Sequence, residues 1–192
     1  MRLENRVAVI TGGASGFGTG IAEIFAREGA QVVIADINAD AADATAGRLG
    51  GMAVQTDVSK NDDMAALAAA VMDRHGRIDI FVNNAGITHL PTLMEEVEEA
   101  EFDRVLMVNT KSVYLSARHV VPVMKRQQSG AILNIASTAG VSPRPRLSWY
   151  NATKGWMITA TKAMAIELAP FGIRVNALNP VSYTHLTLPT KA

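Results

Sequence analysis

The sequence contains no cysteine, which excludes disulfide bonds and thiolate metal sites. Net charge is also absent, because 18 basic side chains balance 18 acidic ones, so no overall field attracts nucleic acid or an anionic membrane surface. No apolar run approaches the roughly 20 residues of a membrane-spanning helix. The 4 histidines are too scattered for metal-ligand spacing. We therefore expect a cytoplasmic protein without a metal, whose partners are small molecules rather than nucleic acid or a membrane.

What the sequence does contain is a series of short apolar runs of strand length, as expected for strands buried on both faces. They are residues 7–11, 32–36, 52–58, 78–84, 131–137 and 173–178. Helical periodicity lies between them, for example at 20–29 and 62–76, each ending in glycine, and at 95–110 and 111–127. This alternation predicts a single α/β domain built on a Rossmann-type, doubly wound parallel sheet.

The glycine-rich stretch TGGASGFGTG follows the first predicted strand. Gly12, Gly16 and Gly18 would let the backbone approach a pyrophosphate at the start of a helix. Glycines also mark ordinary turns, so the loop alone is a weak signal. The next strand ends at Asp36, where a carboxylate can accept hydrogen bonds from a ribose 2′-hydroxyl and repel a 2′-phosphate. Unless Asp36 merely ends a strand, the pattern favours NAD over NADP.

Tyr150 and Lys154 are four positions apart in WYNATKGW and so share one face of a helix. A tyrosine normally loses its proton only near pH ~10, but a nearby ammonium group and an oxidised nicotinamide would favour the phenolate. Such a pair is more often a solvated helix face than a catalytic site. Ser137, however, ends the preceding strand at the same edge of the sheet, where its hydroxyl could hold a substrate oxygen.

Taken together, these motifs resemble those of the short-chain dehydrogenase/reductase family, in its main NAD(P)-dependent oxidoreductase branch. The resemblance runs from residue 2 to about residue 180 and rests on TGGASGFG, Asp36, Asp57-Val58, NNAG at 83–86, Asn109, Ser137 and YNATK. It implies an NAD-dependent enzyme that interconverts an alcohol and a ketone or aldehyde by hydride transfer. A nucleotide-sensing or scaffold protein without turnover is the alternative. Sugar alcohols, steroids, cyclic alcohols and 3-oxoacyl thioesters all fit as substrates.

The resemblance also implies roles for individual residues. Tyr150 would be the acid/base, Lys154 a ligand of the nicotinamide ribose that favours the phenolate, Ser137 the holder of the substrate oxygen, and Asn109 the support of a water that relays protons. The implied cofactor-binding residues are Gly12, Ser15, Gly16, Phe17, Gly18, Asp36, Asp57, Val58, Asn84, Tyr150 and Lys154. The family also implies a homo-oligomer, commonly a tetramer, formed through the helices at 113–124 and 152–169.

The C-terminal stretch departs from the family after Asn179-Pro180. VSYTHLTLPT corresponds to one reading frame of a transposase-type sequencing adapter, so we expect a dinucleotide-binding domain over 1–180 followed by a non-native tail over 181–192. Val181 itself is compatible with either segment. On this interpretation the seventh strand of the family is missing and the printed chain is an inactive fragment. The alternative is a natural short C-terminus.

Overall fold

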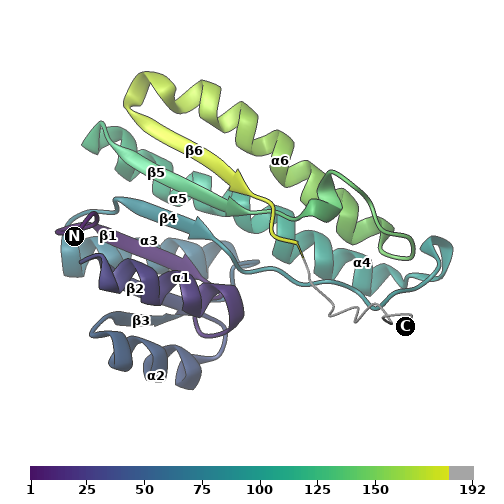
Figure 1. Ribbon diagram of the computed structural model, residues 1–192, viewed down its shortest axis with the longest axis horizontal. Coiled ribbons are helices and arrows are strands. Elements are labelled where there is room, and N and C mark those ends of the chain that lie inside the picture. The colour runs from purple at the N-terminus through teal and green to yellow at the C-terminus, as the bar shows by residue number, and fades with distance from the viewer. Residues whose placement is uncertain (182–192) are drawn as a thin grey trace, which may run out of the picture.

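The computed structural model describes residues 1–181, and these contain one six-stranded sheet in the order β3-β2-β1-β4-β5-β6 (Figure 1). Every neighbouring pair of strands is parallel. The strands are β1 (Val7–Thr11), β2 (Gln31–Asp36), β3 (Met52–Gln55), β4 (Ile80–Asn83), β5 (Gly130–Ile135) and β6 (Ile173–Leu178). This order is that of a doubly wound Rossmann sheet, so the predicted fold class is confirmed.

Helices cover the two faces of the sheet and build a core on each (Figure 1). On one face Ala22 and Ala42 pack against the sheet, and on the other face Leu67, Leu115 and Leu168 do so. The first pair belongs to α1 (Gly16–Arg27) and α2 (Ala39–Leu49), and the other three belong to α3 (Asn61–His75), α5 (Ser112–Gln127) and α6 (Ser148–Leu168). Both faces of the central strands are therefore buried, which explains why their sequences are almost continuously apolar.

The helices predicted at 95–110 and 111–127 form one continuous run rather than two separate elements. After a 3₁₀ turn at Met94–Glu96, α4 spans Glu99–Leu106 and passes through a π-helical segment, Met107–Lys111, directly into α5. No glycine or proline between residues 99 and 115 interrupts the run. π-Helical segments occur often at functional sites, and this one contains Asn109.

Helix α2 was not among the helices named from the sequence, because ADAADATAGRL consists mainly of small residues and contains one large apolar side chain, Leu49. Its ends are nevertheless well defined. Asn38 caps the N-terminus by accepting a hydrogen bond from the Ala41 amide, and Gly50 closes the C-terminus with φ of 65°. The strand predicted at 52–58 ends three residues early, at Gln55, because Asp57 turns the chain toward α3 by accepting two hydrogen bonds from Ser59.

Strand β6 lies at one edge of the sheet within residues 1–181. Its two sides differ, since Ile173 and Val175 are buried whereas Arg174 and Asn176 are exposed. Six strands are present in this part of the chain, and positions 182–192, where the tail is predicted, lie outside it. No helix in residues 1–181 is both long and apolar enough to cross a membrane.

Candidate active site

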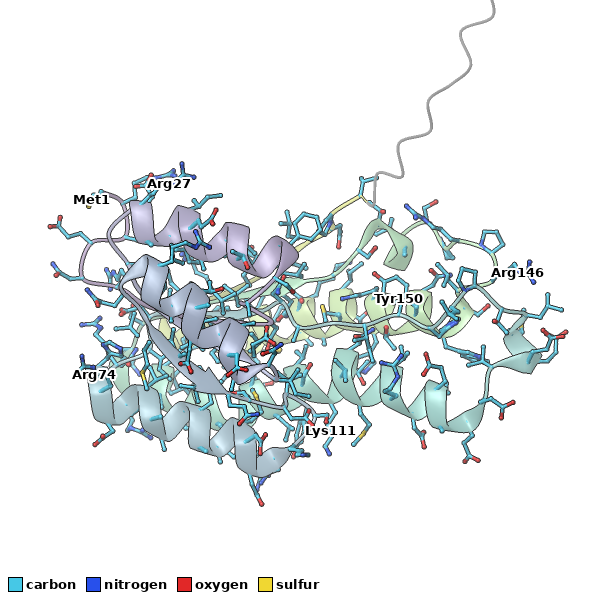
Figure 2. All side chains as sticks on the ribbon, turned by 90° about the horizontal axis from the view of Figure 1, so that it is seen from below. Met1, Arg27, Arg74, Lys111, Arg146 and Tyr150 are labelled. Carbon is cyan, nitrogen blue, oxygen red and sulfur yellow. The ribbon has the colours of Figure 1, made fainter. Side chains whose placement is uncertain are left out.

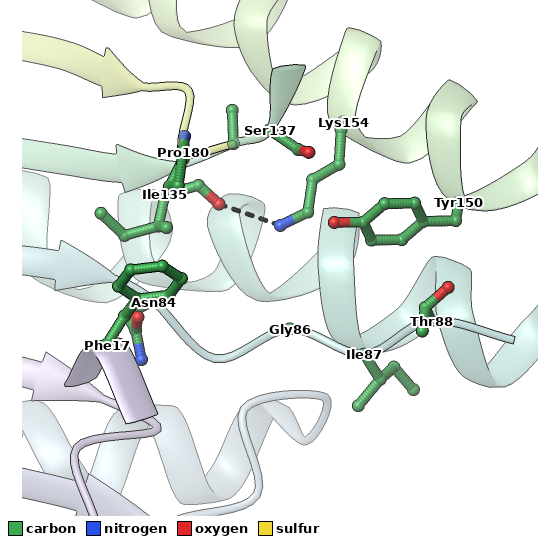
Figure 3. A pocket seen from close by; sticks show the side chains of 11 residues that line it. Phe17, Asn84, Gly86, Ile87, Thr88, Ile135, Ser137, Tyr150, Lys154 and Pro180 are labelled. Atoms are coloured by element: carbon green, nitrogen blue, oxygen red, sulfur yellow. Dashed lines mark hydrogen bonds between the residues drawn. The ribbon is translucent and has the colours of Figure 1, made fainter. Parts of the chain in front are cut away.

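Two adjoining cavities open at the carboxyl edge of the sheet, where β1 and β4 lead to helices on opposite faces. Gly86 and Ile87 line both of them. The first, shown in Figure 3, is lined by Phe17, Asn84, Gly86, Ile87, Thr88, Ile135, Ala136, Ser137, Tyr150, Lys154 and Pro180. The second, of about 430 Å³, is lined by Gly12, Ser15, Asp36, Ile37, Thr56, Asp57, Val58, Ser59, Ala85, Gly86, Ile87, Arg104 and Val108. This is the position at which doubly wound sheets bind their ligands.

The glycine-rich loop is shaped by close contact with the strand beside it. Gly12 adopts a φ of 60°, and a Cβ at Gly18 would collide with the Gly12 carbonyl. Asn84 fixes the loop by donating hydrogen bonds to the carbonyl oxygens of Thr11 and Gly12, at 2.9 and 3.0 Å. The result is an open backbone surface at the start of α1, which suits a pyrophosphate.

The acidic residues of the second cavity are held by nearby backbone and side-chain donors. Asp36 accepts hydrogen bonds from the amides of Ala14 and Asn38, both at 3.1 Å. Burial alone would raise the pKa of Asp57, but hydrogen bonds from Ser59 outweigh it and hold this pKa below its usual value. Both carboxylates therefore sit in fixed positions beside the glycine-rich loop.

Ser137, Tyr150 and Lys154 meet in the first cavity. Ser137 was predicted to end a strand, but β5 ends two residues earlier, at Ile135, and Ser137 instead caps a 3₁₀ turn; Tyr150 and Lys154 lie in the first two turns of α6. Figure 3 shows the hydroxyl of Tyr150 pointing toward the Lys154 amine, which itself points to the Ile135 carbonyl. The Lys154 amine donates to the Ile135 carbonyl at 2.9 Å. Its side chain is 4% exposed, and this burial lowers the pKa of Lys154 to about 8. The Ser137 hydroxyl accepts from the Ala139 amide at 3.1 Å.

Asn109 lies behind the first cavity and is completely buried. Its side-chain oxygen accepts from the Ile87 amide at 2.9 Å, while its nitrogen donates to the Ile87 carbonyl and to the Thr153 hydroxyl, at 2.8 and 3.0 Å. A Cβ at Gly86 would lie 3.2 Å from the Lys154 amine and 3.4 Å from the Asn109 oxygen. Glycine at position 86 thus leaves room for the two polar side chains to lie close together.

Tyr150 is positioned by its neighbour Trp149 and by the loop before α6, which carries Arg146 and extends beyond Tyr150 (Figure 2). The Trp149 indole donates to the Met94 carbonyl at 3.1 Å, and its ring meets Phe102 edge-on with centroids 5.4 Å apart. The Thr92 amide donates to the Arg146 carbonyl at 3.0 Å. These contacts join the β4–α4 loop to the start of α6, and so hold the two sides of the cavity together.

The structure brings most of the predicted site residues to the two cavities. Phe17, Asn84, Ser137, Tyr150 and Lys154 line the first, and Gly12, Ser15, Asp36, Asp57 and Val58 line the second. Gly16, Gly18 and Asn109 line neither cavity; Gly18 and Asn109 are buried, whereas Gly16 is exposed. The sequence prediction did not include Ile37, Ile87, Thr88, Arg104, Val108 or Pro180. The sequence could have indicated two of these residues. Arg104 and Val108 are four positions apart on the helical run that carries Asn109, so they lie on one side of it.

The crevice fits a dinucleotide in shape and in chemistry. The surface at Gly12 and Gly18, which a side chain would fill, matches a pyrophosphate. Asp36 can serve a ribose, and the apolar side chains of Ile37 and Val58 can face an adenine ring. No cluster of His, Asp and Glu within residues 1–181 could hold a metal ion. Fold and crevice together define a Rossmann-type dinucleotide-binding protein.

Comparison with known proteins narrows this class. Residues 6–187 match the model of the short chain dehydrogenase family. The 4-formylbenzenesulfonate dehydrogenase of Comamonas testosteroni is 46% identical over 188 residues, which cover 94% of this chain and 74% of the relative. The tropinone reductase-like 1 protein of Erythroxylum coca is 43% identical over 188 residues, covering 93% of this chain and 68% of the relative.

Among solved structures, the 3-ketoacyl-(acyl-carrier-protein) reductase of Brucella melitensis complexed with NADH is 51% identical. It superposes with a TM-score of 0.92 over 93% of this chain and 76% of that one. The chain therefore belongs to the short chain dehydrogenase family of oxidoreductases, and the predicted resemblance is confirmed. The family and its NADH-bound member support hydride transfer with a nicotinamide cofactor.

Proposed function

We propose that the chain is an NAD-dependent oxidoreductase that interconverts an alcohol and a ketone or aldehyde, with Tyr150 as the acid/base. One observation carries the proposal. Tyr150, Lys154 and Ser137 line a single cavity, and that cavity adjoins the dinucleotide crevice at Gly86 and Ile87. A protein that only senses a nucleotide would have no need for a complete proton-exchanging set beside it.

In the oxidation direction, the Ser137 hydroxyl holds the substrate oxygen and Tyr150 removes the proton from that oxygen. When NAD is bound, its nicotinamide would accept the hydride from the substrate carbon that carries this oxygen. The alcohol thus loses one hydride and one proton, and a carbonyl forms. Phe17, which is 65% exposed, lines the same cavity and lies beside Asn84 in Figure 3, at the end away from Tyr150.

Lys154 has two roles in this scheme. As an ammonium group it stabilises the phenolate of Tyr150 across the cavity. Because burial lowers the pKa of Lys154 to about 8, it can also pass a proton onward near neutral pH. Asn109, beside Lys154 and fixed to both backbone groups of Ile87, is placed to support a water that carries this proton to solvent.

Asp36 supports NAD as the preferred cofactor. Its carboxylate is fixed beside the glycine-rich loop by the Ala14 and Asn38 amides. A 2′-phosphate placed there would be repelled, whereas two ribose hydroxyls could donate to the carboxylate.

A homo-oligomer, with a tetramer as the family's common form, is supported by the outer faces of α5 and α6. Tyr114 on α5 is 52% exposed, while Trp156 and Ile166 on α6 are 44% and 79% exposed. Large apolar side chains on two neighbouring helices are characteristic of subunit contacts.

The proposed activity is tested by following NADH formation or consumption with a panel of secondary alcohols, sugar alcohols and aldehydes, including 4-formylbenzenesulfonate. Two proteins are compared: the printed chain, and a chimera that continues from residue 181 with the remaining segment of the Brucella melitensis reductase. We expect the chimera to be the more active, because β6 presents a free edge in residues 1–181. The proposal fails if both proteins bind NADH and neither turns over any substrate, since that result identifies a non-catalytic nucleotide binder.

Tyr150→Phe is the decisive variant in the active protein, and Tyr114→Phe on the exposed face of α5 is its matched control. Loss of the proton-exchanging hydroxyl should reduce kcat on the order of 10² to 10⁴-fold, with the Kd for NADH unchanged. Tyr114→Phe should leave both quantities unchanged. A Tyr150→Phe enzyme that keeps most of its activity across the pH range removes Tyr150 from the mechanism.

A further inference from the structure

Arg104 is a basic side chain in the lining of the second cavity that the family motifs do not explain. The same lining contains two carboxylates, Asp36 and Asp57, and no lysine or other arginine. Arg104 lies on α4, one turn before Val108, so both side chains face the cavity from one side of the helix.

The guanidinium of Arg104 is held in place from behind. Its Nε and Nη2 donate to the two carboxylate oxygens of Glu101 at 2.8 and 2.7 Å, and Nη2 also reaches the Thr88 carbonyl at 3.5 Å. Nη1 has no hydrogen bond to any of residues 1–181. The side chain is half exposed. A planar cation is thus fixed at the cavity wall with one edge unused.

The position of Arg104 indicates which part of a dinucleotide it would meet. Gly12, Ser15 and Asp36 form the polar end of the cavity, which suits the pyrophosphate and ribose. Ile37, Val58, Ile87 and Val108 supply its aliphatic side chains, between which a flat aromatic ring fits best. Arg104, one turn from Val108, borders this apolar end.

We propose that Arg104 binds the adenine ring of the cofactor, its guanidinium packing on the ring while Glu101 keeps it oriented. Arginine stacks on aromatic faces better than lysine because its guanidinium is planar and weakly hydrated. The positive charge also offsets Asp36 and Asp57, which would otherwise repel the pyrophosphate. This inference rests on the proposed dinucleotide site and adds to it a residue that binds the adenosine half.

Two simpler roles compete with this one. The Glu101–Arg104 pair could be an ordinary surface ion pair at i,i+3, which contributes little by itself. Alternatively, Arg104 could act through its contact with Thr88, which lines the first cavity, and so affect only the nicotinamide half. The three roles predict different binding of ADP-ribose and NADH, because the two ligands share the adenosine half and only NADH carries a nicotinamide.

The experiment measures the Kd of ADP-ribose and of NADH by calorimetry for the full chain and for two variants, without any substrate. Arg104→Met keeps an unbranched apolar side chain and removes the guanidinium. Arg118→Met is the matched control, because Arg118 is an exposed arginine on α5 whose side chain contacts Tyr114 and lines neither cavity. Thermal melting without ligand verifies that both variants are folded.

We expect Arg104→Met to weaken ADP-ribose and NADH by the same factor, about five- to twenty-fold, and Arg118→Met to change neither by more than about twofold. Unchanged binding of both ligands by Arg104→Met overturns the proposal in favour of a surface ion pair. Weaker binding of NADH with unchanged binding of ADP-ribose overturns the proposal and favours a role of Arg104 through Thr88. If the unsubstituted chain binds neither ligand, the proposed dinucleotide site is refuted, and the proposed adenine contact is refuted together with it.

Discussion

At the scale of single residues, the chemistry of the crevice depends on how far each charged group is removed from water. Lys154 lies inside the protein with one carbonyl partner, Ile135, whereas Asp36 sits at the cavity surface and accepts two backbone amides. The lysine is therefore easily deprotonated, and the aspartate remains available to a ribose.

The burial of Lys154 makes the stability of the cofactor-free protein depend on pH. The pKa of this lysine falls from 10.5 to about 8, so its charge opposes folding below pH 8, and this cost disappears as the pH rises from 8 toward 10.5. Lys154→Met has no such cost. Its advantage over the unsubstituted protein should shrink by about 2 kcal/mol between pH 7 and pH 9.5. Urea unfolding at both pH values measures this difference, and parallel pH profiles would contradict it.

Asp36 is expected to decide between NAD and NADP. Asp36→Asn keeps an acceptor for the Ala14 amide but removes the charge, so NAD should bind about 10- to 100-fold more weakly and NADP more tightly. Kd values for both cofactors measure the change, with Asp40→Asn on the exposed start of α2 as the control. An unsubstituted protein that already binds NADP as well as NAD would refute this role.

At the scale of elements, β4, β5 and α6 are joined by a chain of buried polar side chains. Asn83 donates to the Asn134 side-chain oxygen at 2.8 Å, Asn134 donates to the Thr161 hydroxyl at 2.8 Å, and Thr161 donates to the Met157 carbonyl at 2.7 Å. Since β4 leads into Gly86 and α6 carries Tyr150, this chain of hydrogen bonds fixes the two sides of the first cavity relative to each other.

Removing the side chain of Asn134, the central member of this chain of hydrogen bonds, should destabilise the protein. Asn134→Ala leaves the Asn83 amide without its partner in the interior, so the free energy of unfolding should fall by about 2 to 3 kcal/mol. Asn176→Ala, at an exposed position of β6, serves as the control and should change it by less than about 0.5 kcal/mol. Equal urea midpoints for the two variants would show that the network contributes nothing to stability.

At the scale of the whole molecule, the outer apolar faces of α5 and α6 lie on the opposite side of the sheet from α1. If they are subunit contacts, Trp156→Glu and Ile166→Glu should shift the sedimentation coefficient toward that of the monomer, because a buried unpaired charge is strongly unfavourable. Ile24→Glu on α1 is the matched control, since Ile24 is 47% exposed. A monomer in every case would exclude the proposed tetramer. The cytoplasmic location and the tail at 181–192 stay predictions.

The sequence by itself determined the features that depend on local spacing. Apolar runs of strand length predicted all six strands, although three of them, at 52–58, 78–84 and 131–137, are shorter than expected. The glycine-rich loop, Asp36 and the four-residue spacing of Tyr150 and Lys154 placed the crevice at one edge of the sheet. Local periods of two and 3.6 residues fix which way neighbouring side chains point, so such features can be read before any tertiary contact is known.

Only the tertiary structure decided which distant groups meet. Three contacts of this kind join residues between 16 and 22 positions apart in the sequence. Asn109 binds both backbone groups of Ile87, Lys154 is buried against the Ile135 carbonyl, and Arg104 reaches the Thr88 carbonyl from its place at the second cavity. The packing of α2 on the sheet through Ala42 and Ala46 was likewise decided only by the tertiary structure. These features depend on how packed elements approach one another, and burial, which lowers the pKa of Lys154, exists only after that packing is complete.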